Sequence, residues 1–305
     1  MSALATKVCG IELKNPIIAA AGTFAYGVEF KEQLDLNALG GFVVKGLSRE
    51  PIEGNPAPRV VETASGMMNS IGLQNIGVQA FARDKLPALA KLNTAVIANV
   101  FGYRTEDYVE VVRVLNAHAG LAAYELNVSC PNTKHGGIFF SNDSVLLAEV
   151  VSAVKAIARR PVIVKLSPNV SAIEPVAIAA EQAGADALSL VNTFVALAID
   201  SKTRTTRIGA GFGGLSGPAI KPIALRMVYQ AAKAVKIPVI GLGGIATGTD
   251  AAEFLIAGAQ AVQVGTASFW EPRAALNIAK ELEQFLRREK IGSVRDLVGT
   301  LKFPS

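Results

Sequence analysis

Lysine, asparagine and glycine residues end one short apolar segment after another along this chain. Each stands at the C-terminal end of a different segment that has the composition of a buried strand. In parallel sheets these ends lie at one edge, so their side chains converge on one pocket. A single such residue would be an ordinary structural polar group, but five polar ends around one rim exceed what packing alone explains, because each needs a partner when buried. The residues are Lys45, Asn99, Asn127, Lys165, Asn192, Gly243 and Gly265.

Two glycine-rich segments, 241–245 (GLGGI) and 264–267 (VGTA), end the last two of these strands. Glycine lets backbone N–H groups approach a phosphate, and the helix that follows adds its positive N-terminal end. In strand–helix barrels, the loops after strands seven and eight are a recurrent phosphate site. The glycines of 243–248 come late in the chain and lack an acidic partner, so they do not form a dinucleotide fingerprint. The two loops together predict a ligand that carries phosphate.

Lys45 and Lys165 would place positive charge beside the group that carries this phosphate. A reduced flavin is negative near N1 and O2, so a fixed ammonium there stabilises the form that has accepted electrons. Lysine at a barrel strand end also serves aldolases, which form a Schiff base with their substrate. The residues therefore favour a flavin site and leave a Schiff-base site at Lys165 as a remote alternative.

Cys130 lies in the segment 125–132 (ELNVSCPN), just past the fourth expected strand core, where the chain turns at Pro131. A lone cysteine is usually an inert, small apolar residue. At a barrel rim beside Asn127, however, a thiol can act as a base or nucleophile if its surroundings favour the thiolate. Cys130 is therefore the candidate catalytic residue.

The other cysteine, Cys9, lies in the N-terminal lead-in and keeps the inert interpretation. Two cysteines cannot form a disulfide framework, so a reducing compartment is expected. The two histidines are too few for a metal site: His118 is expected on a helix surface, and His135 in the loop over the site.

The elements that position these residues alternate regularly between strand and helix. Continuous rather than alternating apolar runs indicate strands buried on both faces. The eight expected strands are 16–21, 41–46, 95–102, 123–130, 161–168, 187–193, 238–245 and 261–267. The expected helices are 105–118, 143–159, 173–183, 218–235, 250–257 and 273–290, with a start at Thr249 and Asp250 and stops at Gly184 and Gly258.

This order predicts an α/β fold of the (β/α)8 barrel type, in which residues 1–305 form a single domain. A doubly wound open sheet is the alternative. Two connections, 47–75 after the second strand and 194–217 after the sixth, are too long for plain loops. Long loops in this fold usually cover the active site at the C-terminal face of the barrel.

Composition and charge limit the classes of protein to which this chain is expected to belong. Half of the 305 residues are apolar, and the formal net charge of +5 is scattered. The densest basic cluster, Arg287, Arg288 and Lys290, is interleaved with glutamates, which is typical of a solvated helix face and not of a nucleic-acid site. The N-terminus lacks the features of a signal peptide, and no apolar run approaches the ~18 residues of a membrane helix. A cytoplasmic protein without membrane attachment is expected.

With these residues assembled, the sequence closely resembles the dihydroorotate dehydrogenases over essentially its full length. Together the matching segments are strongly specific, although no one glycine loop would suffice. They are 125–137 (ELNVSCPNTKHGG), 66–75 (GMMNSIGLQN), 213–222 (GGLSGPAIKP), 191–193 (VNT), 241–245 and 263–267 (QVGTA).

The resemblance implies oxidation of dihydroorotate to orotate in pyrimidine biosynthesis, with FMN as cofactor. Cys130 matches the base that removes the C5 proton while C6 gives a hydride to flavin N5. The matches to substrate contacts are Lys45, Asn69, Ser70, Ile71, Gly72, Leu73, Asn127, Asn192 and Thr193. The matches to FMN contacts are Ala21, Lys45, Gly46, Asn99, Asn127, Lys165, Val191, Gly217, Gly243, Gly244, Gly265 and Thr266.

A cysteine base marks the soluble class of this family, and segments 128–137 and 214–222 resemble its NAD-linked, two-subunit type. That type implies a partner subunit that carries FAD and a 2Fe–2S cluster, on a homodimer core within a heterotetramer. The fumarate-reducing homodimer is the nearest alternative, and a dihydropyrimidine-oxidising relative and a non-catalytic FMN-binding barrel are more distant. Two residues depart from the family pattern: Ile76 replaces an expected proline, which could loosen the substrate loop, and Ala21 stands where serine is also common.

Overall fold

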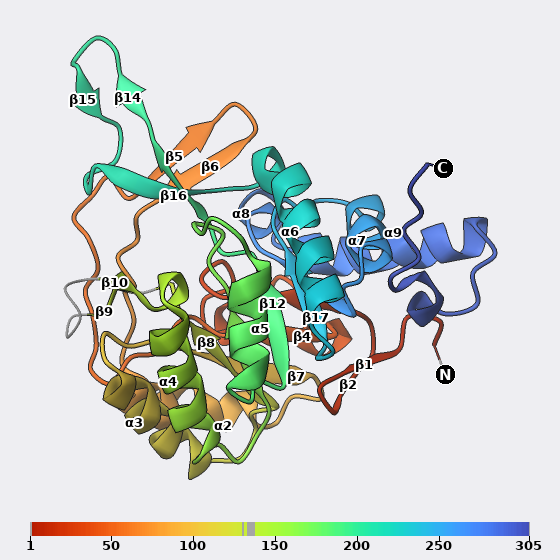
Figure 1. The fold of residues 1–305 in the computed structure, drawn as a ribbon, viewed down its shortest axis with the longest axis horizontal. Coiled ribbons are helices and arrows are strands. Elements are labelled where there is room, and N and C mark those ends of the chain that lie inside the picture. Colours follow the sequence, from red (N-terminus) through yellow and green to blue (C-terminus); the bar gives the residue numbers. More distant parts are fainter. Residues whose placement is uncertain (1, 130, 133–137, 305) are drawn as a thin grey trace.

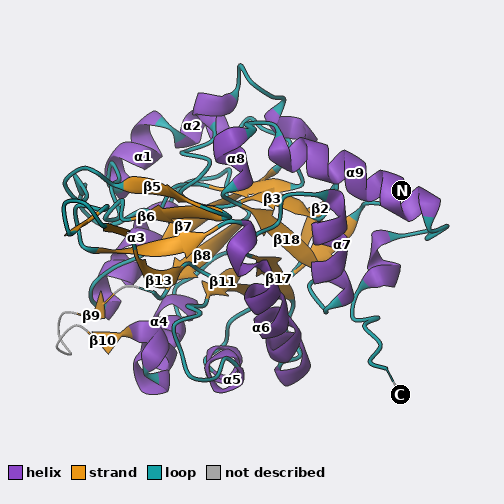
Figure 2. Cartoon of the chain, turned by 90° about the horizontal axis from the view of Figure 1, so that it is seen from above, coloured by secondary structure: helices purple, strands orange, loops and turns teal. Residues whose placement is uncertain are grey.

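The computed structural model describes residues 2–129, 131–132 and 138–304. Its centre is a closed barrel of eight parallel strands in which each strand pairs with the next along the chain. Every barrel strand lies inside a predicted one, so the predicted (β/α)8 barrel is confirmed and the doubly wound sheet is excluded. Figure 2 shows the strands surrounded by helices. They are β3 (Ile17–Ala19), β4 (Gly41–Val43), β7 (Ala95–Val100), β8 (Ala123–Asn127), β11 (Val162–Lys165), β12 (Ala187–Leu190), β17 (Val239–Leu242) and β18 (Ala261–Val264).

Most helices around the barrel overlap the predicted ranges, and all of these except α7 lie within them. These are α3 (Thr105–Asn116), α4 (Ser144–Lys155), α5 (Glu174–Gln182), α6 (Lys221–Ala234), α7 (Gly248–Ile256) and α9 (Ala274–Arg288). Three helices were not predicted, because seven residues or fewer are too few to display a helical period: α1 (Val78–Asp84), α2 (Leu86–Leu89) and α8 (Ala267–Trp270). Among the described residues, no helix combines the length and apolarity that a membrane crossing requires.

The ends of two helices follow from single residues. Gly184 and Gly258, with φ of 98° and 118°, come directly after the C-caps of α5 and α7, as predicted. The predicted start of α7 at Thr249 and Asp250 is wrong by one or two residues. The Thr247 hydroxyl accepts a hydrogen bond from the Asp250 N–H at 3.1 Å, so Thr247 is the N-cap and the helix begins at Gly248.

The barrel interior has two layers of different polarity. The lower layer is apolar and includes Ile18, Val43, Ile97, Ile163 and Ile240. Side chains of the N-terminal hairpin, β1 (Thr6–Val8) and β2 (Ile11–Leu13), belong to the same buried cluster. The upper layer is polar and buried and consists of Asn99, Glu125, Lys165, Ser189 and Gln263. The polar layer is therefore at the end of the barrel where the strands terminate, which is the end predicted to bind ligand.

The two long connections contain strands that pair with each other, which the sequence did not predict. The connection after β4 carries β5 (Val60–Thr63) and β6 (Gly66–Asn69), and the one after β12 carries β13 (Phe194–Leu197) and β16 (Phe212–Ser216). They form an antiparallel sheet in the order β13-β16-β6-β5. In Figure 1, β5, β6 and β16 lie together beyond the barrel, and a further hairpin, β14 (Ile199–Asp200) and β15 (Thr205–Thr206), projects past them.

The remaining elements are short. Residues Pro131–Asn132 (β9) and Ile138–Phe139 (β10) pair as an antiparallel hairpin after β8. Single 3-10 turns connect several larger elements. They are η1 (Val28–Phe30), η2 (Leu36–Ala38), η4 (Phe140–Asn142), η5 (Pro218–Ile220) and η6 (Val294–Leu297).

Candidate active site

A cavity of about 690 Å³ opens at the C-terminal ends of the barrel strands, a size typical of small-molecule sites. It is bounded on the far side by residues of the added sheet, among them Val60, Asn69 and Val195. Every described residue that the sequence assigned to the site lines this one cavity. They are Ala21, Lys45, Gly46, Asn69, Ser70, Ile71, Gly72, Leu73, Asn99, Asn127, Lys165, Val191, Asn192, Thr193, Gly217, Gly243, Gly244, Gly265 and Thr266.

The candidate base, Cys130, lies outside the described residues, as does His135. The chain that leads to Cys130 is described, and Ser129 lines the cavity. The Ser129 N–H donates to Asn127 Oδ1 at 3.2 Å, and the Tyr108 hydroxyl donates to the Asn127 carbonyl at 2.8 Å. The end of β8 is therefore held at the cavity wall by side-chain hydrogen bonds.

A chain of amides crosses the cavity wall from β8 to β12. Asn192 Nδ2 donates to Asn127 Oδ1 at 3.1 Å and to Ser129 Oγ at 3.0 Å. The Oδ1 atom of Asn192 accepts the Thr193 N–H at 2.9 Å. This hydrogen bond distinguishes the oxygen from the nitrogen of the Asn192 amide. Within the described part of the chain, Asn127 Nδ2 makes no hydrogen bond, so it is available to a ligand.

The cavity floor is organised by Glu125, a fully buried carboxylate that the sequence analysis missed. Glu125 Oε2 accepts from Asn99 Nδ2 at 2.8 Å, and Oε1 accepts from Ser189 Oγ at 2.8 Å and Gln263 Nε2 at 2.5 Å. Part of the signal was present in the sequence, because Glu125 and Gln263 each stand two residues before a strand-end residue, Asn127 and Gly265, and so point to the same side of the strand.

We expect Glu125→Ala to lower the free energy of unfolding by about 3 kcal/mol or more. The change leaves three buried donors without an acceptor, each costing about 1–3 kcal/mol. Urea unfolding of the protein without cofactor measures the loss. The matched control is Glu12→Ala, which removes an exposed carboxylate paired with Lys7 and should change stability by less than about 0.5 kcal/mol. A loss below ~1 kcal/mol for Glu125→Ala would contradict this role.

Two lysines give the cavity positive charge. Lys165 is only 7% exposed, and it forms no ion pair or hydrogen bond with the part of the chain described here. Lys45 is half-buried, and burial, followed by the nearby charge of Arg59, lowers its pKa. Arg59 itself is held by Gln74 Oε1 at 2.9 Å and the Glu53 carbonyl at 3.2 Å. Cations without anionic partners at a buried rim indicate an anionic ligand.

The glycine loops at the other end of the cavity present free backbone donors. The N–H groups of Gly243, Gly244, Gly265 and Thr266 make no hydrogen bond within the described residues. A Cβ at Gly244 would lie 2.8 Å from the Gly217 carbonyl oxygen, and φ at Gly244 is +79°, so only glycine fits there. Thr266 Oγ1 of the second loop donates to Ser216 Oγ of β16 at 2.9 Å. These features fit the predicted phosphate.

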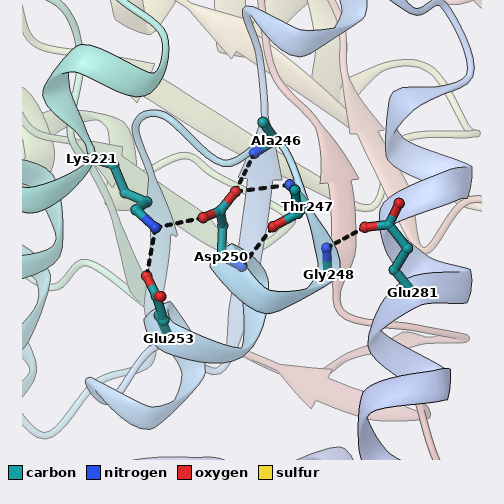
Figure 3. A network of polar contacts seen from close by, with 7 residues as sticks. All are labelled: Lys221, Ala246, Thr247, Gly248, Asp250, Glu253 and Glu281. Atoms are coloured by element: carbon teal, nitrogen blue, oxygen red, sulfur yellow. Dashed lines mark hydrogen bonds and ion pairs between the residues drawn. The ribbon is translucent and has the colours of Figure 1, made fainter.

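The positive N-terminal end of the helix after the first glycine loop, which was predicted to add to the phosphate site, already faces carboxylates of the protein (Figure 3). The N–H groups of Ala246 and Thr247 donate to Asp250 Oδ2, and that of Gly248 donates to Glu281 Oε2. Carboxylates of the protein already occupy these donors at the start of α7. Hydrogen bonds to a phosphate are therefore left to the glycine N–H groups before the helix.

Cys9 packs against the apolar lower layer of the barrel and does not line the cavity. Burial, and next the negative charge of Asp186, raise the pKa of Cys9 to about 12. Its thiol is therefore almost entirely protonated at pH 8.

We therefore expect Cys9 of the native Cys130→Ala variant to resist alkylation by iodoacetamide at pH 8. The same variant unfolded in guanidinium should react at the rate of a free cysteine, because its pKa returns to about 8.5. Mass spectrometry of timed samples makes the comparison. Equal rates in the native and unfolded protein would overturn the assignment of Cys9 as inert.

Comparison with known proteins identifies the family. The family model described as dihydroorotate dehydrogenase matches residues 3–286. The chain belongs to the dihydroorotate dehydrogenase family. It is 78% identical over 300 residues to the putative dihydroorotate dehydrogenase A (fumarate) of Solibacter usitatus, covering 98% of this chain and 99% of that protein.

Other relatives within the dihydroorotate dehydrogenase family bear a different name. The dihydroorotate dehydrogenase B (NAD(+)) catalytic subunits of Citrifermentans bemidjiense and Geobacter sp. are 54% and 53% identical, each over 98% of both chains. The family predicted from the sequence is thus confirmed. The names of the relatives divide between fumarate and NAD as electron acceptor, while they agree on the dehydrogenase.

Proposed function

We propose that this chain oxidises dihydroorotate to orotate, with FMN and substrate side by side in the cavity at the barrel mouth. The observation that carries the proposal is the convergence of all the described candidate residues on that one cavity. Family membership supports the substrate. The cavity supports the cofactor, because free glycine N–H groups at one end suit a phosphate and unpaired lysines suit an electron-rich ring.

The orphaned acceptor in the cavity floor also fits a flavin. Gln263 Oε1 is buried and has no hydrogen-bond partner, while Gln263 Nε2 is fixed by Glu125. A buried acceptor without a partner is costly, so a ligand N–H is expected to satisfy it. Gln263 lines the same cavity as the FMN contacts proposed above. When bound, FMN would accept the hydride from C6 of dihydroorotate.

The chain itself has to bind the substrate anion and move one proton. Cys130 is proposed to remove the C5 proton as a general base. Lys45, with Arg59 behind it, provides the positive charge that a carboxylate requires. The free Nδ2 of Asn127, the side chains of Asn192 and Thr193, and the loop from Asn69 to Leu73 supply donors and acceptors for the pyrimidine ring.

We further propose that the electrons leave through a partner subunit to NAD. An iron–sulfur cluster normally needs four cysteine ligands, and this chain has two cysteines, one of them assigned to catalysis. FAD and a 2Fe–2S cluster would therefore have to be carried by the partner. Phe269 and Trp270 of α8 are both 57% exposed, and Phe269 lines the cavity, so an apolar surface is available for docking at its mouth.

A homodimer core within a heterotetramer is part of the same proposal. Val195, Ile199 and Phe212, from the added sheet and its projecting hairpin, are each more than half exposed. Apolar side chains gathered in this way are typical of a surface covered by another chain. We propose that a second copy covers them and that the assembly works in the cytoplasm.

The acceptor is tested with the purified chain alone, which we expect to transfer electrons from dihydroorotate to an artificial dye but to neither NAD nor fumarate. Fumarate is the second candidate because the relative at 78% identity carries it in its name. Steady-state rates with dye, NAD and fumarate make the comparison. Rapid fumarate reduction by the isolated chain would establish the alternative, and rapid NAD reduction would rule out the need for a partner.

The experiment that tests the function itself begins with the colour and content of the purified protein. FMN released by denaturation and identified by chromatography supports the proposal, together with dye reduction that depends on dihydroorotate. A colourless protein that borohydride traps with an aldehyde or ketone substrate would support the Schiff-base alternative at Lys165.

A further inference from the structure

Lys221, the first residue of α6, forms two ion pairs across to α7 (Figure 3). Its Nζ lies 2.5 Å from Asp250 Oδ1 and 2.8 Å from Glu253 Oε2. Burial opposes the charge on Lys221, but hydrogen bonds to the two carboxylates outweigh it and raise the pKa of the lysine. Burial likewise opposes the charge on Asp250, and the hydrogen bonds from Lys221 and the backbone outweigh it and lower the pKa of that carboxyl.

The second oxygen of the Asp250 carboxylate holds the backbone that follows the glycine pair. Asp250 Oδ2 accepts the Ala246 N–H at 3.0 Å and the Thr247 N–H at 2.8 Å. Because Lys221 binds Oδ1, the carboxylate is turned so that Oδ2 faces this backbone. Lys221 is thus linked through Asp250 to the backbone of Ala246 and Thr247, which follows the glycine pair.

The glycine pair also packs directly against the start of α6. A Cβ at Gly244 would lie 2.8 Å from Lys221 Cβ and 3.0 Å from the Lys221 backbone nitrogen. A Cβ at Gly243 would lie 2.6 Å from Ala224 Cβ. The segment is therefore held between α6 and α7, and its two glycine N–H groups are left without partners in the described structure.

Lys221 is not itself placed to bind a ligand. It does not line the cavity, and its ammonium is already shared by two carboxylates. Any effect of Lys221 on a bound phosphate must therefore pass through the loop.

We propose that Lys221 is a positioning residue for the phosphate of FMN. Acting through Asp250, it holds the N–H groups of Gly243 and Gly244 in the arrangement that the phosphate requires. The inference rests on the proposed function, because it takes FMN as the ligand of the cavity. On this proposal, the preference of the site for a ligand with phosphate depends on the Lys221–Asp250 ion pair, which does not contact the ligand.

The test compares FMN with riboflavin, which has the same ring system but no phosphate, as ligands of the cofactor-free protein. Lys221→Met should weaken FMN binding about 10- to 100-fold, the equivalent of one charge-assisted contact, and leave riboflavin binding within about twofold. Fluorescence titration gives both dissociation constants. The matched control is Lys155→Met, which removes a similarly exposed ion pair with Asp186 away from the cavity and should change neither constant.

Asp250→Asn provides a second variant, because an amide can still accept the loop N–H groups but cannot attract the lysine charge. It should lower the preference for FMN over riboflavin as Lys221→Met does, and combining the two changes should add little. An unchanged preference in either single variant, or equal weakening of both ligands, would overturn the positioning role. If the wild-type protein shows no preference for FMN over riboflavin, the proposed cofactor site fails instead.

Discussion

Cys130→Ala is expected to retain FMN and to slow flavin reduction by dihydroorotate about 10²- to 10⁴-fold, the usual contribution of a general base. Ser129, the preceding residue, lines the cavity and accepts a hydrogen bond from Asn192 Nδ2 at 3.0 Å. Alanine offers no atom that can accept the C5 proton. Stopped-flow absorbance under anaerobic conditions measures the rate.

Two further variants make this result specific to Cys130. Cys9→Ser changes the other cysteine, which lies against the lower layer of the barrel, and should reduce flavin at the wild-type rate. Cys130→Ser should be slow at neutral pH, because an alcohol is a far weaker base than a thiolate. It should recover part of the rate at high pH, where the hydroxyl begins to ionise. A Cys130→Ala variant that reduces its flavin at nearly the normal rate would remove Cys130 from the mechanism.

Lys165→Met is expected to lower the reduction potential of bound FMN by about 30–60 mV and to weaken FMN binding. The lysine is buried at the end of β11 and lacks an anionic partner within the described residues, so its charge acts mainly on the ligand. A charged contact contributes about 1.5–3 kcal/mol, and for a two-electron couple ~30 mV corresponds to ~1.4 kcal/mol. Redox titration against reference dyes measures the potential.

The control for Lys165 is again Lys155→Met, which changes the net charge equally but at an ion pair outside the cavity. That variant should keep the wild-type potential to within about 10 mV, since a distant surface charge is largely screened. If Lys165→Met binds FMN and has an unchanged potential, the lysine does not stabilise the reduced cofactor.

The barrel could be predicted because its strands are buried on both faces. Segments such as Val162–Lys165 (VIVK) and Val239–Leu242 (VIGL) are apolar runs that end in a polar residue or are followed by glycine, and this pattern needs no knowledge of distant contacts. The same pattern identified the cavity, since strand ends of a parallel barrel meet at one face.

The sheet over the cavity could not be predicted, because its pairing is non-local. Asn69 of β6 lies opposite Gly214 of β16, which is 145 residues later in the chain. Strand β16 (Phe212–Ser216) is rich in glycine and lacks the alternation that indicates a half-buried strand. Its register is set by the partner strand and by the cavity below it, neither of which is visible in the local sequence.

The polar floor and the helix start were missed for a different reason. Glu125 stands within an apolar run, and its burial is tolerable only because Asn99, Ser189 and Gln263 arrive from three other strands. Likewise, nothing in the local sequence shows that Glu281 of α9 accepts a hydrogen bond from the Gly248 N–H at the start of α7. Partners brought together by the fold decide which polar groups remain available.

The most direct test of the account is anaerobic mixing of the purified protein with dihydroorotate while the flavin absorbance is followed. We predict that the oxidised flavin band bleaches with about one equivalent of substrate per bound FMN and that orotate is formed. Dihydrouracil, which lacks the carboxylate, should leave the band unchanged, because the cation at Lys45 then has no partner. A bound flavin that stays oxidised with dihydroorotate, or that bleaches as readily with dihydrouracil, would contradict the account.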